Sequence, residues 1–397
     1  MELIVQDRRW IRELANVVTL FRNRGRTWWM RPMFFRREWD GNVLLRNIMA
    51  EEINDTIVKF LRMKWEDYYF LESLLAANIE RMDTNMRDAI TPRERLLITL
   101  RYLATGETYA SLQFLFKVSQ SSIRSIIPEV CDCLIAALQE YIKLPSNKQQ
   151  WLEISDMFKQ RWNFPHAVGA IDGKHVPIRS PKHSGSDYFN YKKFHSIVML
   201  ALVDADYNFL YVNVGGQGSI SDGGIFKNTQ LYEMLETNRL DIPDPEILRV
   251  PYVTKVPYFI LGDKAFAFTN YCIRPYGGAD NTLGAIQRTF NYFQSRARMT
   301  VENTFGIVSN RFQVIRGPIL LEPQKARKVV LTAAYLHNFL RKRASRDYYM
   351  PTASLNRNTT NRTQTALESL QTISTRAPDR LLCIRNHVAN DLYYNPT

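Results

Sequence analysis

The hydrophobic positions divide the chain into a helical first part and a mixed second part. Over residues 51–142, apolar residues recur at helical spacing. From residue 166 onward, short uninterrupted apolar runs such as AVGAI, SIVMLALV and YFIL are typical of buried strands. Helical patterns at 222–236, 295–316 and 324–342 stand between or after those runs. A few strands with helices between and after them predict an α/β fold with a mixed sheet.

Within the helical part, the spacing predicts a helix-turn-helix. Thr91 is the expected cap of a helix that Pro92 and Glu94 begin and Gly106 ends. A short helix over YASLQFLFK and a turn at Val118 then lead into a helix with a polar start. In such a motif the last helix enters the major groove of DNA, whereas the same pattern also fits an ordinary three-helix bundle. The residues that would face DNA are Lys117, Ser121, Ser122 and Arg124.

Composition predicts four segments along the chain. Residues 1–50 mix arginine with Trp and Phe, which favours an arm laid over a neighbouring domain by its aromatic side chains; an arm that touches phosphates is the alternative. Residues 51–145 form the helical domain and residues 146–345 the α/β domain. Residues 346–397 are polar and poor in aromatic side chains, so we expect a flexible C-terminal tail.

Charge and cysteine content narrow the class of protein. The 397-residue chain carries a formal net charge of +13, which favours polyanionic partners such as DNA or RNA. Its four cysteines are too few and too scattered for a disulfide framework or a zinc site, so we expect reduced thiols in an intracellular protein. No stretch approaches the ~20 apolar residues that a membrane span needs, and we expect no membrane partner.

Three carboxylates stand in settings suited to metal chemistry. Asp172 and Asp263 each follow an apolar run, so each is expected at the end of a strand, where ligands of open α/β sheets gather. A plain turn residue is the alternative for either. Glu302 borders the apolar stripe of a helix and could instead pair with Arg298. Three such carboxylates repel one another unless cations hold them together, and Mg²⁺ suits oxygen ligands.

Long motifs, among them GAIDGKHVPI, SDGGIFKNT, LGDKAFAF and SRARMTVENTFGIV, resemble the PIF/Harbinger superfamily of DDE transposases, which includes Harbinger transposase-derived nucleases. The resemblance runs from about residue 26 to 343. It implies a ribonuclease-H-like catalytic domain behind a helical N-terminal region. The two Asp residues of the family motif match Asp172 and Asp263, and its Glu matches Glu302. Phe293 stands where many relatives have an Arg, which puts one DNA contact in doubt.

The resemblance also covers Asp222 in SDGGIF. This residue is either a fourth acid near the metals or, as we favour, the N-cap of the following helix. His175 is a second auxiliary candidate, although it also suits a buried structural histidine. We expect cations near these acids to hold the phosphate backbone of DNA. The candidates are Lys174, Lys192, Lys193, Arg296 and Arg298.

The acid trio predicts a metal-dependent nuclease or transposase that cuts or joins DNA phosphodiester bonds. Two Mg²⁺ or Mn²⁺ ions about 3.5–4 Å apart would activate a water or a DNA 3′-hydroxyl. Asp172 would bridge the ions, and Asp263 and Glu302 would each complete the shell of one. One alternative is a domesticated DNA- or chromatin-binding protein whose catalytic site is unused. Another is a phosphohydrolase with a deep pocket for small molecules.

Partners and localisation are expected from the charge and the resemblance. The resemblance implies a Myb-like DNA-binding partner protein, and a homo-oligomer is left open. We expect the protein in the nucleus, with the cytoplasm as a second compartment. The basic run at Arg341, Lys342, Arg343 and Arg346 is the candidate import signal. Cations that offset the dipole at the end of a helix are the alternative reading of the same run.

Overall fold

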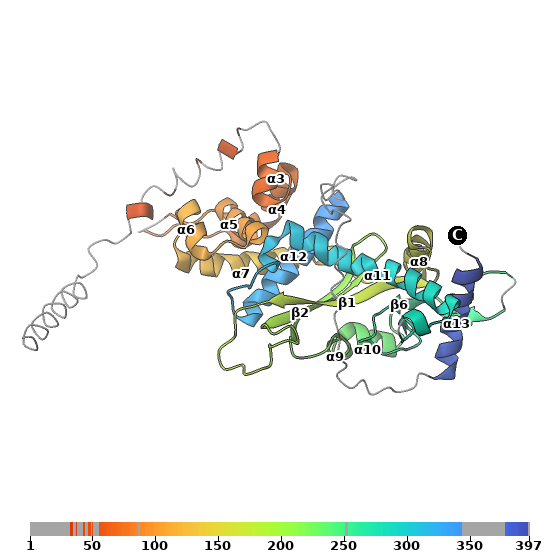
Figure 1. Ribbon diagram of the computed structural model, residues 1–397. Helices are drawn as coiled ribbons and strands as arrows, with labels where there is room; N and C mark the ends of the chain where they lie inside the picture. The colour runs from red at the N-terminus through yellow and green to blue at the C-terminus, as the bar shows by residue number, and fades with distance from the viewer. Residues whose placement is uncertain are drawn as a thin grey trace, which may run out of the picture.

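The computed structural model describes most of the chain and shows a helical region beside a region built on a sheet (Figure 1). The predicted arm at 1–50 lies almost entirely outside the described residues. The described residues are 55–85, 88–250, 253–278, 280–343 and 378–395, with isolated positions between 32 and 50.

Among the described residues, five helices form the helical region, and several of their ends follow local sequence signals. The Thr91 hydroxyl accepts a hydrogen bond from the Glu94 amide, and the Glu94 carboxylate accepts one from the Thr91 amide, as the motif predicts. Gly106 ends that helix in the left-handed conformation, with φ of 71°. The helices are α3 (Asp55–Leu61), α4 (Trp65–Ile79), α5 (Pro92–Thr105), α6 (Tyr109–Phe116) and α7 (Gln120–Ala137).

Helices α5, α6 and α7 have the order and lengths that the sequence predicts for a helix-turn-helix. Ser119 caps α7, because its hydroxyl accepts a hydrogen bond from the Ser122 amide. Ser121 and Arg124 are exposed in the first turns of α7, while Ile123 and Ile127 are buried. The start of α7 is thus accessible, and its contact with DNA stays a prediction.

A five-stranded mixed sheet organises the second region. Its strands lie in the order β3-β2-β1-β6-β7. The long strands β1, β2 and β3 pair antiparallel, whereas β6 runs parallel to both β1 and β7. Every residue of β2 is buried, as expected for an uninterrupted apolar run. The strands are β1 (Ala167–Pro177), β2 (Ser196–Val203), β3 (Phe209–Gln217), β6 (Phe259–Leu261) and β7 (Cys272–Ile273); β4 (Glu246–Ile247) and β5 (Lys255–Val256) pair separately.

Helices cover both faces of the sheet. In Figure 1, α11 (Ala285–Arg311) and α12 (Pro323–Arg343) cross one face, and α9 (Asp222–Lys227) and α10 (Gln230–Glu236) lie against the other. Helix α8 (Lys148–Trp162) packs against β1 and α11, and its buried Trp151 donates a hydrogen bond to the carbonyl of Leu240.

The structure corrects the prediction of a flexible tail for part of the C-terminal segment. Residues Asp379–Tyr394 form helix α13, which packs against α11. Val388, Ala389 and Leu392 are buried there at helical spacing. The polar composition averaged over residues 346–397 conceals this short amphipathic stretch. Residues 344–377 lie outside the described part of the chain.

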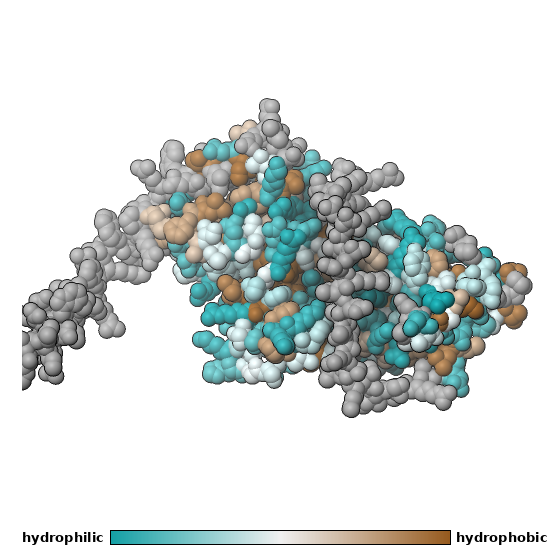
Figure 2. Space-filling model, viewed as in Figure 1, coloured by the Kyte–Doolittle hydropathy of each residue, from teal (hydrophilic) through white to brown (hydrophobic). Residues whose placement is uncertain are grey.

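The two regions share one hydrophobic core, in which α7 packs on α12. The Thr332 hydroxyl on α12 contacts the Cys131 carbonyl on α7, and Lys328 pairs with Asp132 at 2.6 Å. Figure 2 shows hydrophilic and apolar residues interspersed over the visible face. None of the helices in the described ranges combines the length and apolar character needed to cross a bilayer.

The basic end of α12 is engaged in contacts within the fold. Arg341 is buried and donates hydrogen bonds to Asn208 and to the Asp206 carbonyl. Arg343 pairs with Asp67 at 2.8 Å. Lys342 and Arg343 are exposed, so both readings of the run stay open, and Arg346 lies outside the described residues. Nuclear localisation stays a prediction.

Candidate functional site

Asp172 lies in the middle of β1 and not at a strand end, which corrects the sequence prediction. It pairs with Ala201 of β2, and that pairing continues to Pro177. The apolar run stops at Ile171 because the residues after it are only half-buried. The strand nevertheless continues, because its backbone still pairs with β2. On its other side, β1 pairs with β6 only up to Ala170. Asp172 therefore stands where one edge of β1 has no strand partner.

Asp222 faces β1 and is not the cap of α9, which corrects the second sequence preference. Ser221 is the cap, because its hydroxyl accepts a hydrogen bond from the Gly224 amide. A Cβ atom added at Gly173 would lie 2.1 Å from Oδ1 of Asp222. The Asp222 carboxylate thus packs directly on the backbone of β1, next to Asp172. Only glycine at position 173 leaves room for that approach.

Asp263 follows β6 in the short loop that the sequence predicts. Its carboxylate accepts a hydrogen bond from the Ala265 amide at 2.8 Å, which fixes the side chain in the loop. A Cβ atom added at Gly223 would lie 2.3 Å from the Ala265 carbonyl oxygen. The start of α9 therefore packs against the loop that carries Asp263. The two glycines bring Asp172, Asp222 and Asp263 to one edge of β1.

Glu302 lies on α11, as predicted, but Arg298 stands between it and Asp172. The guanidinium of Arg298 donates to Asp172 Oδ2 at 3.3 Å and also pairs with the Glu302 carboxylate. The Glu302 side chain is 47% exposed, against 18% for Asp172. Both readings that the sequence left open for Glu302 thus hold in part: it pairs locally with Arg298, and that pair reaches the acids on the sheet.

The electrostatics of the three aspartates reflect their burial and proximity. Burial raises the pKa of Asp172 to about 7; Arg298 opposes this shift, while Asp263 and Asp222 add to it. Burial also raises the pKa of Asp222 to about 6, with Asp263 adding to the shift and Lys192 opposing it. Each carboxylate therefore lies within electrostatic reach of another, so the arrangement concentrates negative charge.

The donor set suits a hard divalent cation. Oδ1 of Asp222 is buried and has no hydrogen-bond partner among the described residues. Carboxylate oxygens are the ligands that Mg²⁺ and Mn²⁺ prefer. No three acidic, histidine or cysteine side chains in the described ranges already have the spacing of a formed metal centre.

Of the predicted cations, Lys192 acts on Asp222, on Lys174 and on His175, so these four residues lie close together. Lys192 and Lys193 are exposed on the segment between β1 and β2, and Arg296 is exposed on α11. Lys174 is half-buried on β1, where burial and Lys192 lower its pKa. Nδ1 of His175 lies 2.9 Å from the Ser196 hydroxyl. Burial first, and Lys192 second, lower the pKa of His175 to about 4, so the neutral imidazole is expected at neutral pH.

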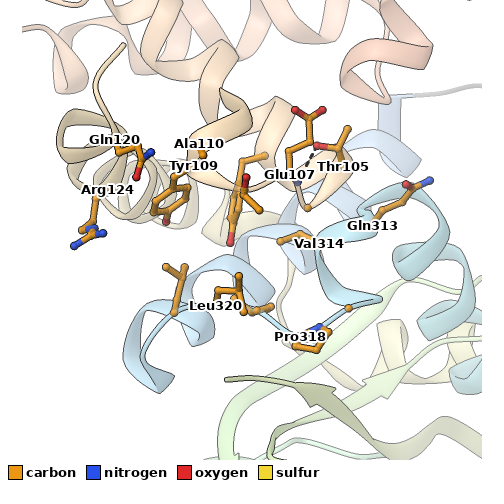
Figure 3. Close-up of a pocket in the computed structure, with 16 residues that line it drawn as sticks. Thr105, Glu107, Tyr109, Ala110, Gln120, Arg124, Gln313, Val314, Pro318 and Leu320 are labelled. Carbon is orange, nitrogen blue, oxygen red and sulfur yellow. Dashed lines mark hydrogen bonds between the residues drawn. The ribbon is translucent and has the colours of Figure 1, made fainter. Parts of the chain in front are cut away.

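A cavity of about 490 Å³ lies elsewhere, between α5, α6, the start of α7 and residues 313–321 (Figure 3). Tyr109, Arg124 and Leu320 line it, and none of the predicted catalytic acids does. A small-molecule phosphohydrolase would need its acids in a deep pocket, and this cavity does not provide that arrangement.

Sequence reasoning identified the three acids of the family motif and kept Asp222 as a possible fourth acid, but it favoured a cap for Asp222 and missed the glycines beside these acids. The signal was present in two Asp-Gly pairs, Asp172-Gly173 and Asp222-Gly223. Such pairs are common in turns, and only the fold shows that each glycine admits a backbone or carboxylate from another element.

Comparisons with known proteins show relatives over most of the chain. The family model described as DDE superfamily endonuclease matches residues 171–338. The chain is 24% identical over 311 residues to "Protein ALP1-like" of Arabidopsis thaliana, covering 76% of this chain and 74% of that protein. It is 23% identical over 273 residues to "Putative nuclease HARBI1" of Homo sapiens, covering 68% and 73%. No solved structure matches the chain. Residues 171–338 therefore match DDE superfamily endonucleases, and the chain is similar to Harbinger-derived relatives, which supports the resemblance seen in the sequence.

Proposed function

We propose that this protein is a divalent-metal-dependent DNA endonuclease or transposase. The observation that carries the proposal is the convergence of Asp172, Asp222 and Asp263 from β1, α9 and the loop after β6, with one oxygen of Asp222 left without a partner. The family relationship supports an endonuclease, and the order of strands in the sheet supports the ribonuclease-H-like arrangement that the family implies.

Asp172, Asp222, Asp263 and Glu302 would hold two Mg²⁺ or Mn²⁺ ions. When bound, the ions would act as Lewis acids and lower the pKa of an attacking water or DNA 3′-hydroxyl. In this arrangement Asp172 provides the central carboxylate, since it is the one within reach of both other aspartates and of Arg298. Asp263 is held ready by its hydrogen bond to Ala265. Asp222 adds an oxygen that has no hydrogen-bond partner among the described residues.

Arg298 has two roles in the proposal. Without DNA it offsets the charges of Asp172 and Glu302. A DNA phosphate offers the same bidentate partner as a carboxylate, so it competes for the guanidinium. Transfer of Arg298 to the phosphate frees Glu302, which is exposed enough to turn toward Asp172. Arg298 then fixes the scissile strand, and Glu302 completes the set of four carboxylates.

The remaining contacts with DNA follow from the exposed cations. Lys192, Lys193 and Arg296 are exposed and would bind the DNA backbone, and the first turns of α7 would make a second, helix-turn-helix contact. The net charge of +13 supports binding that weakens steeply with salt. A nuclear site of action and a Myb-like partner are part of this proposal.

The decisive experiment is a plasmid-nicking assay with Mg²⁺, Mn²⁺ or EDTA. Asp172→Asn, Asp222→Asn and Asp263→Asn are each expected to reduce cleavage to background, and Glu302→Gln to leave at most a trace. Glu140→Gln is the control, since Glu140 is exposed and pairs only with the exposed Lys143. Wild-type cleavage rates in Asp172→Asn or Asp222→Asn would contradict the assigned site.

A second function, DNA or chromatin binding without catalysis, is favoured by one observation. Arg298 already pairs with Asp172 and Glu302, so part of the negative charge of the site is offset without cations. The two functions differ in their response to metal. A nuclease gains thermal stability from Mg²⁺ or Mn²⁺ by mass action, and Asp222→Asn removes that gain. A protein that only binds DNA shows neither the gain nor cleavage.

A further inference from the structure

The segment between β1 and β2 ends in a turn that presents three exposed side chains next to the acids. We call residues 190–194 the tip turn. Tyr191, Lys192 and Lys193 are all exposed there, and Tyr191 keeps 65% of its surface accessible. In Figure 1 the segment between β1 and β2 extends beyond the end of the sheet. The contacts that Tyr191 makes within the fold do not explain why a largely exposed tyrosine stands between the sheet and two lysines.

The tip turn is built rigidly from buried polar groups. Asn190 is only 3% exposed, and its side-chain oxygen accepts hydrogen bonds from the amides of Lys192 and Phe194 at 2.9 and 3.3 Å. Its side-chain nitrogen donates to the Ser196 hydroxyl at 2.8 Å. Ser196 also contacts His175, so the turn is tied to both β1 and β2. The position of Tyr191 is therefore fixed by the fold.

Tyr191 presents a ring that is supported from one side. The Tyr191 ring meets the His175 ring edge-on, with centroids 5.4 Å apart, and Lys192 Nζ lies 5.4 Å from the Tyr191 centroid. The largely exposed tyrosine leaves room for a further flat group. Aromatic side chains of this kind, beside lysines that track phosphates, bind nucleobases that are not paired.

The tip turn lies on the side of β1 that carries Asp222. His175 follows Gly173 by two residues, so the two positions share one face of the strand, and the Asp222 carboxylate packs on that face at Gly173. Lys192 is also close enough to Asp222 to affect its pKa, so the tip turn and Asp222 belong to one surface. Asp172 lies about 10 Å from His175 along the strand.

We propose that the tip turn binds an unpaired base a few nucleotides from the scissile phosphate, with Tyr191 stacking on the base and Lys192 and Lys193 contacting its phosphates. This inference rests on the proposed function, because it names the form of DNA that the acidic site receives: DNA with locally separated strands. A base held in this way keeps the adjacent strand in place along the open edge of β1.

The test measures binding in EDTA, so that it does not depend on cleavage. Fluorescence anisotropy would compare a labelled duplex with the same duplex carrying a central unpaired stretch. We expect wild type to prefer the unpaired substrate, and Tyr191→Ala to weaken that binding about tenfold while changing duplex binding less than twofold. Tyr191→Phe and Tyr191→Trp should retain the preference. Tyr394→Ala is the matched control, since Tyr394 is also 65% exposed and lies at the end of α13.

Three outcomes would overturn the inference: no preference in wild type, an unchanged preference in Tyr191→Ala, or an equal loss on both substrates. The last result would assign Tyr191 to general contact with the backbone. Asn190→Ala gives a second reading, because it leaves the aromatic ring in place and loosens only its support; partial loss of the preference is expected. Failure of the proposed function would look different, since metal-dependent cleavage would be absent whatever residue stands at 191.

Discussion

Two buried polar clusters in this protein differ in how completely their groups are paired. The turn between β2 and β3 meets α12 in the first cluster, where Asn338 donates to the carbonyls of Phe209 and Tyr141 and accepts from the Phe209 amide. In the same cluster His337 contacts the Tyr207 carbonyl at 2.8 Å. The second cluster is the acidic edge of β1, where carboxylates face one another.

The difference separates groups that stabilise the fold from groups that await a ligand. Paired polar groups in a core fix one arrangement of the chain, because each would lose its partner if the elements moved. Carboxylates that lack partners destabilise the fold in the absence of cations and are retained for function. Mutations in the first cluster should therefore reduce stability, and mutations in the second should reduce activity.

The largest expected effect is on stability and comes from Asn338. The change Asn338→Ala removes three hydrogen bonds and leaves backbone groups unpaired, so the free energy of unfolding should fall by about 3 kcal/mol. Urea unfolding would measure it. Gln324→Ala, at an exposed position of the same helix, is the control and should change stability by about 0.5 kcal/mol or less. Equal effects of the two changes would remove the distinction between the clusters.

Gly173→Ala should act on activity. The added methyl group would meet the Asp222 carboxylate and push it away from Asp172. A displacement of about 1 Å in a catalytic group costs about 100-fold in rate, and we expect a loss of that size in the nicking assay. Gly277→Ala is the matched control, because nothing lies within 4 Å of a Cβ atom added there. Full activity in Gly173→Ala would show that Asp222 does not need its place on β1.

The pH dependence of stability should show the effect of His337, which belongs to the first cluster. Burial lowers the pKa of His337 to about 3, below the ordinary 6.5 of a histidine. Between these pH values His337 binds a proton in the unfolded chain but not in the folded chain. Stability is therefore lost as the pH falls below about 6.5. The loss should approach 1.4 kcal/mol per pH unit. Urea unfolding of His337→Gln should show a shallower slope, and an identical slope would exclude His337 as its source.

The smallest expected effect is a gain in stability. Asp222→Asn removes one of three neighbouring negative charges and should raise the free energy of unfolding by about 1 kcal/mol in EDTA. Thermal unfolding with and without Mg²⁺ would test it, since wild type should gain stability from the ion and the variant should not. A loss of stability in EDTA would place Asp222 with the paired, structural groups.

The sequence predicted the elements of this fold well where local signals were strong. The box at Thr91, the pair of strands around the DADYN turn and the position of Asp263 after β6 follow from patterns within a few residues. Long motifs identified the family, which relatives and the family model confirm.

The remaining features depend on contacts between distant residues. The approach of Asp222 to Gly173 joins positions 49 residues apart, and no spacing in the sequence reports it. Asp172 was expected at a strand end, because periodicity cannot show that β2 continues to pair beyond the apolar run. The bridge of Arg298 between Asp172 and Glu302 likewise joins two elements that meet only in the fold.

Helix α13 has a consequence for the biosynthesis of the protein. Its Arg385 lies over the rings of Tyr276 and Phe268, at 3.9 and 4.9 Å, and its buried face covers α11. During translation those surfaces are made long before the helix that covers them. A nascent chain that has reached only Arg343 therefore exposes apolar surface to chaperones and to other chains.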